Sequence, residues 1–255
     1  MWKMFVADLD KTLADLEGNI SEYTAEVITA SQKRGIKWMI ATGRGYGTVL
    51  PIIKKANLNV DLILLNGAQY RSAEGKIQLK EVINKAAVNR IISYLQQEEV
   101  EFEINTTQES YLSAASSKGE NKDVLPLEKF DVASHDVLKF FVFSDKLEKI
   151  EKVKKELALW KDLQVSSSAE WNIELTSASA DKAIMLERVA EAYSMKKDEI
   201  LIFGDGENDK KMFQLFPHTR AVANAVPSVK MLAEKIIEEH DKDGVAREVV
   251  RILNG

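Results

Sequence analysis

The chain contains no cysteine and only three histidines among its 255 residues. The absence of cysteine excludes disulfides, thiolate catalysis and zinc sites with cysteine ligands. The histidines (His135, His218 and His240) have no spacing that indicates a metal site or a catalytic triad. We expect them to be structural or solvated, so the chemistry has to be sought in other side chains.

An excess of positive charge is also missing, because the formal net charge is -5. Proteins that grip the phosphate backbone of nucleic acids need basic residues, so nucleic acid is not an expected partner. No stretch approaches the roughly 20 apolar residues of a membrane span, and no positively charged leader precedes the first strand pattern. These absences predict a cytoplasmic globular protein with no membrane partner.

The first part of the chain alternates apolar strands with helices. Strands are predicted at 4–7, 36–41 and 61–65, and helices at 21–34 and from about 45 to 55. This alternation is typical of a parallel sheet with crossover helices. A half-polar pattern follows and resembles a hairpin at the edge of that sheet.

The same alternation returns near the C-terminus. Helices and strands are predicted in turn at 179–193, 199–203, 219–223, from about 227 and at 244–253. We expect this segment to continue the first sheet. Residues 1–81 and 181–255 would then form one discontinuous core domain.

The block between these parts, residues 82–180, lacks regular strand–helix alternation. It has an αββ-like pattern twice, with strands linked as hairpins, and predicts an inserted α+β domain. Within it, residues 116–129 form a long polar loop that could be functional or disordered.

Functional side chains follow three of the predicted core strands: Asp8 and Asp10, Thr42, and Asp205 and Asp209. A lone Asp-x-Asp more often ends a strand and caps a turn. In a parallel sheet, however, all these turns lie at one edge, where the sites of open α/β sheets form. Carboxylates for Mg2+ and a hydroxyl with nearby backbone N–H groups suit phosphoryl transfer.

Cationic and small residues complete this candidate site. Gly43 lets the backbone approach an anion, and Arg44 follows it in the same turn, where it could contact substrate or only pair at the surface. Lys182, at the start of a predicted helix, adds a mobile charge that can reach a transferring phosphoryl group.

In their order and spacing, these motifs resemble the haloacid dehalogenase superfamily, and within it the Cof-type phosphatases with an inserted cap. The resemblance runs through the segments Asp8–Leu13, Ala41–Arg44, Asn66–Ala68, Lys182, Gly204–Asp209 and Asp243–Ala246. It implies an α/β fold, with a Rossmann-like three-layer core around a mostly parallel sheet and an inserted α+β cap domain at 82–180.

The resemblance also implies a role for each matching residue. Asp8 would be the nucleophile, and Asp10 the general acid and base. Thr42 and Lys182 would hold the phosphate, with Gly43 and Arg44 beside them, and Asn208 would orient the site. Mg2+ would bind Asp8, the backbone carbonyl of Asp10 and Asp205, with Asp209 supporting the metal.

Three positions depart from the family pattern. Lys11 and Ala183 stand where glycine is usual, and Ala221–Ala225 replaces a more typical run that contains glycine. The last two departures could narrow the space beside the phosphate, which bears on the substrate more than on the reaction.

The sequence therefore predicts a Mg2+-dependent phosphatase that hydrolyses small phosphorylated metabolites through an aspartyl-phosphate, as a monomer or weak homo-oligomer. We expect the inserted block to read the leaving group. Two alternatives stay open at this point: a phosphomutase or phosphotransferase of the same fold, and a phosphate-binding regulator without turnover.

Overall fold

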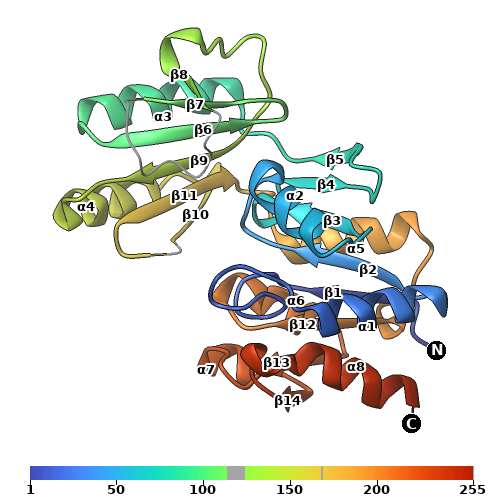
Figure 1. The fold of residues 1–255 in the computed structure, drawn as a ribbon. Helices are drawn as coiled ribbons and strands as arrows, with labels where there is room; N and C mark the ends of the chain where they lie inside the picture. The colour runs from blue at the N-terminus through green and yellow to red at the C-terminus, as the bar shows by residue number, and fades with distance from the viewer. Residues whose placement is uncertain (114–123, 168, 255) are drawn as a thin grey trace. The chain divides into compact units, whose positions relative to one another are not determined.

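The computed structural model describes residues 1–113, 124–167 and 169–254. The chain divides into two compact units, Met1–Leu79 with Lys182–Gly255, and Lys80–Asp181 (Figure 1). We call them the core unit and the inserted unit.

The core unit is built on an eight-stranded sheet. Its strands are β1 (Met4–Ala7), β2 (Lys37–Ala41), β3 (Asp61–Leu64), β4 (Gln69–Arg71), β5 (Ile77–Lys80), β12 (Ile200–Gly204), β13 (Thr219–Val222) and β14 (Lys235–Ile237). Their order across the sheet is β14-β13-β12-β1-β2-β3-β4-β5. Neighbours from β14 to β3 are parallel, and β4 runs antiparallel to β3. The sheet is therefore mostly parallel.

Strand β1 lies in the middle of this sheet, between β12 and β2. All four of its residues are buried. The Phe5 ring packs edge-on against Trp38 of β2 and Phe203 of β12, with centroids 5.5 and 6.2 Å apart. This packing fixes the strand, and hence the position of the residue that follows it, Asp8.

Helices cover both faces of the core sheet (Figure 1). They are α1 (Glu22–Lys33), α2 (Tyr46–Lys55), α5 (Lys182–Ala192), α6 (Lys210–Leu215), α7 (Pro227–Lys230) and α8 (Gly244–Asn254), with short 3-10 turns η1 (Leu65–Gly67), η3 (Lys197–Glu199), η4 (Glu207–Asp209) and η5 (His240–Lys242). Helix α1 packs with α8, and α5 with α6. The Ser21 side chain caps α1 by accepting a hydrogen bond from the Thr24 N–H at 3.0 Å. The predicted three-layer α/β core is confirmed.

The inserted unit has its own six-stranded sheet, in the order β10-β11-β9-β6-β7-β8. Its elements are α3 (Lys85–Gln97), β6 (Glu101–Thr106), β7 (Ser110–Leu112), β8 (Val124–Pro126), η2 (Leu127–Lys129), β9 (Val137–Phe143), α4 (Leu147–Leu157), β10 (Leu163–Ser166) and β11 (Asn172–Ser177). Side chains of α3 and α4 form one apolar core with alternate residues of β6, β9 and β11. The predicted α+β architecture of this block is confirmed.

The structure differs from the predicted elements in three places. Strand β14 was not predicted, because it is short and two of its three residues are exposed. Helix α5 begins at Lys182 and not at 179, because residues 178 and 179 form a turn in which the Ala180 N–H donates to the Ser177 carbonyl at 2.9 Å. In the predicted loop, 124–129 forms β8 and η2, while 116–123 lies outside the described residues.

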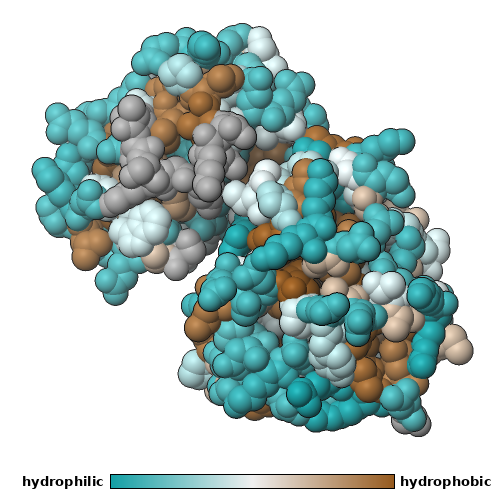
Figure 2. All heavy atoms as spheres, viewed as in Figure 1, coloured by the Kyte–Doolittle hydropathy of each residue, from teal (hydrophilic) through white to brown (hydrophobic). Residues whose placement is uncertain are grey.

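The visible surface of each unit is largely hydrophilic, with smaller hydrophobic patches (Figure 2). Among the described residues, no helix has both the length and the apolar character needed to cross a membrane.

Candidate active site

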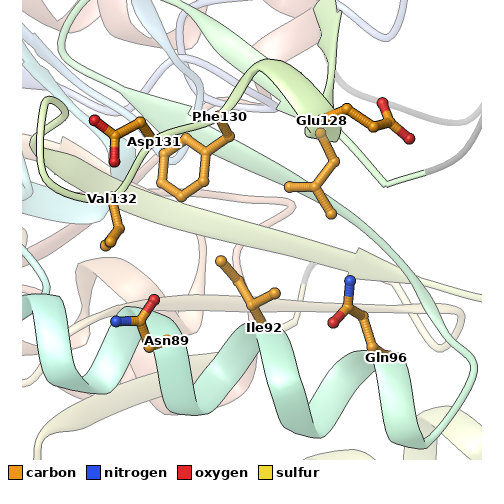
Figure 3. Close-up of a pocket in the computed structure, with 8 residues that line it drawn as sticks. Asn89, Ile92, Gln96, Glu128, Phe130, Asp131 and Val132 are labelled. Atoms are coloured by element: carbon orange, nitrogen blue, oxygen red, sulfur yellow. The ribbon is translucent and has the colours of Figure 1, made fainter.

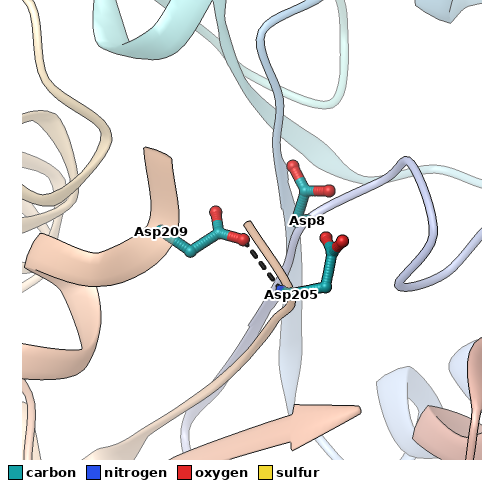
Figure 4. A group of neighbouring side chains, drawn as sticks. All are labelled: Asp8, Asp205 and Asp209. Atoms are coloured by element: carbon teal, nitrogen blue, oxygen red, sulfur yellow. Dashed lines mark hydrogen bonds between the residues drawn. The ribbon is translucent and has the colours of Figure 1, made fainter. Parts of the chain in front are cut away.

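Asp8 and Asp205 follow neighbouring parallel strands at the same edge of the core sheet. Asp8 comes directly after β1, and its N–H donates to the Phe203 carbonyl of β12 at 3.0 Å. Asp205 follows Gly204, the last residue of β12. Their carboxylates point into the same space (Figure 4). Strand order thus unites two acids that are far apart in the sequence.

Asp209 joins this pair from the turn η4. Its Oδ2 accepts hydrogen bonds from the N–H groups of Asp205 and Gly206, at 3.0 and 3.1 Å. A Cβ atom on Gly204 would lie 2.7 Å from the same oxygen, so a residue without a side chain is needed there. Asp209 is completely buried, and its carboxylate holds the turn that presents Asp205.

Lys182 links the acids through its ammonium group. Its Nζ donates to Oδ1 of Asp8 at 2.6 Å and to Oδ1 of Asp209 at 2.8 Å. The lysine is the first residue of α5, and its side chain is only 1% exposed. A buried ammonium with two carboxylate partners is charged and fixed in place.

The charges in this cluster shift one another's pKa values. Burial by itself lowers the pKa of Lys182, but the charges of Asp209 and Asp8 outweigh it and raise this pKa. Burial raises the pKa of Asp8, against the opposing charge of Lys182 and together with the charges of Asp209 and Asp205. Burial and the Asp209 charge raise the pKa of Asp205 from 3.8 to about 6. The carboxyl groups of Asp8 and Asp205 are therefore harder to ionise in this cluster than in water, because the cluster concentrates negative charge.

A divalent cation would relieve this excess. Carboxylate oxygens of Asp8, Asp205 and Asp209 all lie within 4.8 Å of one another. The Lys182 ammonium offsets one of these charges, and Mg2+ prefers carboxylate oxygens as ligands. The donor set therefore fits Mg2+. The carboxylate of Asp10, the fourth predicted metal residue, lies outside this group, and its predicted ligand atom is a backbone carbonyl.

A second group of residues surrounds the predicted anion loop. Thr42 is fully buried, and its Oγ1 accepts a hydrogen bond from the Arg44 N–H at 3.1 Å. Asn66 lies against this loop, since a Cβ atom on Gly43 would be 3.1 Å from its Oδ1. The same oxygen accepts a hydrogen bond from Asn208 Nδ2 at 3.0 Å. Asn66 thereby connects the loops that follow β2 and β12.

Two of these structural roles were not predicted. Asn66 belongs to a recognised motif but had no assigned role, and its φ of 54° shows that the turn after β3 needs a left-handed residue. Thr12 donates its hydroxyl to Oδ1 of Asp205 at 3.1 Å. A polar residue directly after a strand was the available signal for Asn66. Thr12 lies in the recognised segment Asp8–Leu13, but nothing in that segment indicated that its hydroxyl would bond Asp205.

Asp10 and Arg44 form an ion pair beside the cluster. Arg44 Nε donates to Oδ2 of Asp10 at 2.9 Å, and Nη2 donates to Oδ1. Both side chains are partly exposed, at 44% for Asp10 and 36% for Arg44. The predicted contact between Arg44 and substrate stays a prediction, as do the assigned catalytic roles.

The first departure from the family pattern has a structural explanation. Lys11 has a φ of 58°, in the left-handed region where glycine is favoured, which accounts for the usual glycine. Asn224 Nδ2 donates to the Lys11 carbonyl at 2.9 Å and ties this turn to the segment after β13. Ala183, the second departure, is fully buried.

The inserted unit has a separate hollow of about 450 Å³ between α3 and the segment after β8 (Figure 3). It is lined by Asn89, Ile92, Gln96, Leu127, Glu128, Phe130, Asp131 and Val132. None of the predicted site residues lines it, and apolar side chains, Ile92 of α3 and Phe130 of the facing segment, point toward each other within it (Figure 3). It is therefore a different kind of surface from the acidic cluster.

The chain resembles known proteins along nearly its whole length. The family model for haloacid dehalogenase-like hydrolases matches residues 5–249. The chain belongs to this family. A solved haloacid dehalogenase-like hydrolase from Bacteroides thetaiotaomicron has the same fold, with a TM-score of 0.89 at 24% identity, over 99% of this chain and all of that one.

Relatives in this haloacid dehalogenase-like family include named phosphatases. Phosphatase YwpJ of Bacillus subtilis is 27% identical, and the match covers 98% of this chain and 100% of the relative. The 5-amino-6-(5-phospho-D-ribitylamino)uracil phosphatase YwtE of Bacillus subtilis is 25% identical over 99% of each chain. The predicted family and the predicted hydrolase class are confirmed.

Proposed function

We propose that this protein is a Mg2+-dependent phosphatase that hydrolyses small phosphorylated metabolites through an aspartyl-phosphate on Asp8. The observation that carries the proposal is the buried cluster in which Lys182 bonds to Asp8 and Asp209, with Asp205 beside them. The phosphatase names of the relatives support the same class of reaction.

In the first step, an Asp8 oxygen attacks phosphorus and the bond between phosphorus and the ester oxygen breaks. Asp10 gives its proton to the departing oxygen. In the second step, water attacks the phosphoaspartate, Asp10 takes the proton from that water, and phosphate leaves Asp8. Asp10 returns to its starting state after each turnover.

Lys182 and the anion loop hold the phosphoryl group during both steps. The lysine ammonium offers positive charge next to the nucleophile, and the loop of Thr42 and Gly43 offers a hydroxyl and backbone N–H groups. Asp8, Asp205 and the Asp10 carbonyl would hold Mg2+, with support from Asp209. The ion would supply positive charge that neutralises phosphate oxygens, so that an acidic site can accept a dianion.

The experiment measures phosphate release from p-nitrophenyl phosphate with and without Mg2+. Asp8→Asn should lower kcat by at least about 10,000-fold, because removing a nucleophile removes the whole covalent route. The matched control is Asp162→Asn, which replaces an exposed carboxylate in the inserted unit. Equal activity of Asp8→Asn and the control would contradict the mechanism.

The same assay separates the alternatives. Strict need for a bisphosphorylated activator would indicate a phosphomutase. Binding of Mg2+ and phosphate esters without any turnover would indicate a regulator. A panel of esters that includes 5-amino-6-(5-phospho-D-ribitylamino)uracil, the substrate in the name of YwtE, would then identify the substrate class.

A further inference from the structure

The ion pair between Arg44 and Asp10 has a specific geometry. Arg44 uses two adjacent nitrogens, Nε and Nη2, and each bonds a different oxygen of the carboxylate. Such a fork fixes the plane of a carboxylate as well as its position, which a single point charge does not do. Arg44 therefore sets the orientation of the Asp10 side chain.

Backbone hydrogen bonds fix the main chain of the loop that contains Asp10, whereas the Asp10 carboxylate is bonded by Arg44. The N–H groups of Leu13 and Ala14 both donate to the Leu9 carbonyl, at 3.1 and 2.8 Å, so the turn is fixed around Asp10. Within the described parts of the chain, both hydrogen bonds to the Asp10 carboxylate come from Arg44. Without them, a side chain that is 44% exposed would be free to rotate.

Arg44 is itself fixed at both ends. Its N–H donates to Thr42 Oγ1 at 3.1 Å, and its carbonyl accepts from the Leu65 N–H at 3.1 Å. At the other end, a Cβ atom on Gly18 would lie 3.5 Å from Nη2. The turn that contains Gly18 therefore passes close to the guanidinium. The backbone of Arg44 is held on both sides of its Cα atom, and its guanidinium is held by the Asp10 carboxylate.

We propose that Arg44 positions Asp10 for proton transfer to the leaving oxygen, an inference that rests on the proposed phosphatase function. To act as an acid, one carboxyl oxygen has to carry a proton in place of one N–H···O bond. The remaining bond from Arg44 still holds the other carboxyl oxygen in place while the proton moves to the ester oxygen.

This role has a consequence that direct phosphate binding lacks. An alkoxide is a poor leaving group and needs the proton, whereas a dinitrophenolate departs without one. Loss of a residue that positions the acid therefore slows alkyl esters selectively. Loss of a residue that holds phosphate slows all esters alike, since every substrate carries the same phosphoryl group.

The experiment compares kcat/KM for a primary alkyl phosphate, p-nitrophenyl phosphate and dinitrophenyl phosphate. The enzymes are wild type, Arg44→Gln, Arg44→Lys, Asp10→Asn and the double variant Asp10→Asn/Arg44→Gln. The matched control is Arg90→Gln, because Arg90 also bonds both oxygens of one carboxylate, that of Asp162, at 2.8 and 2.9 Å. Thermal unfolding of each variant verifies that it is folded.

We expect Arg44→Gln to lower kcat/KM by about 100-fold for the alkyl ester and by less than about 3-fold for dinitrophenyl phosphate. Arg44→Lys should show the same selectivity with a smaller loss, because a lysine keeps the charge but not the fork. In the Asp10→Asn background, Arg44→Gln should add no further selectivity, since Arg44 acts through Asp10.

Equal losses for all three esters would overturn the proposal and assign Arg44 to phosphate binding. Selectivity that persists in the double variant would overturn it as well. Failure of the proposed function gives a different result: wild type would release no phosphate from any ester, or Asp8→Asn would retain activity. Arg44→Lys keeps the test open if Arg44→Gln does not fold.

Discussion

Lys182 in the core unit and Lys139 in the inserted unit are both buried, at 1% and 0% exposure, and both pair with carboxylates. Lys182 bonds Asp8 and Asp209 at 2.6 and 2.8 Å. Lys139 lies 3.1 Å from Glu174. The two lysines therefore carry similar electrostatic costs of burial, yet they occupy contrasting places in the fold.

The partners of the two lysines are brought to them in different ways. Lys182 meets Asp8 across 174 residues, through turns at the edge of a parallel sheet. Lys139 and Glu174 lie within neighbouring antiparallel strands, where Glu174 pairs with Phe141, two residues from the lysine. The register of β9 and β11 is enough to bring Lys139 and Glu174 together. Lys182, Asp8 and Asp209 meet only because three separate turns lie at the same edge of the core sheet.

This difference separates the proposed reactive cluster from a structural pair. Beyond strand ends, backbone N–H groups and side chains can turn toward a ligand, so excess negative charge there has a possible partner in a cation. In the middle of strands, the backbone groups are already used by the ladder. We therefore interpret the Lys139–Glu174 pair as part of the stability of the inserted unit.

Replacing Lys182 gives the largest expected effect on activity. Lys182→Met should lower kcat/KM by about 1,000-fold or more, because in the proposed mechanism it removes a fixed charge beside the transferred phosphoryl group. Lys139→Met is the matched control, and its kcat/KM on p-nitrophenyl phosphate should stay within about 3-fold of wild type in conditions where it is folded. Similar losses in both variants would remove the distinction between the two lysines.

Replacing Lys139 should instead weaken the fold. Lys139→Met leaves Glu174 buried without this charge partner and should lower the free energy of unfolding by about 3 kcal/mol, measured in urea. The double variant Lys139→Met/Glu174→Leu should regain much of that loss. Added Mg2+ should stabilise Lys182→Met, whose acid cluster remains, but should leave Lys139→Met no more stabilised than wild type. Selective stabilisation of Lys139→Met by Mg2+ would contradict the structural interpretation.

The smallest predicted effect concerns pH and the core cluster. In the metal-free protein, burial and the Asp209 charge raise the pKa of Asp205 from 3.8 to about 6. The folded state then binds this proton more tightly than the unfolded chain does. The resulting contribution to stability is complete below about pH 3.8 and is lost as the pH rises through about 6.

Binding of Mg2+ requires the ionised carboxylate, so its effect has the opposite pH dependence. Mg2+ should raise the melting temperature by several degrees at about pH 7.5, and by less than about half as much at about pH 5. Asp205→Asn is the control, in which the Mg2+ effect should be weaker at both values. A Mg2+ effect in wild type that does not change over this range would contradict the assignment of Asp205 to the metal.

Much of the core could be predicted because its elements have strong local patterns. The apolar run of β1 and the Ser21 cap of α1 both appear in the structure as expected. The strand at the edge of the sheet was harder to predict, because β14 has only three residues, Lys235–Ile237, and two of them are exposed. Local sequence cannot reveal a strand that is stabilised mainly by pairing with a neighbour.

The sequence by itself indicated the family, most of the strands and helices along the chain, and the side chains that follow β1, β2 and β12. The tertiary structure decided which of those side chains meet. Arg44 pairs with Asp10, 34 residues away, and Asn66 bonds Asn208 across 142 residues. These pairings depend on strand order in the sheet and on side-chain rotamers, because a motif specifies which groups reach a sheet edge but not how their atoms pair there.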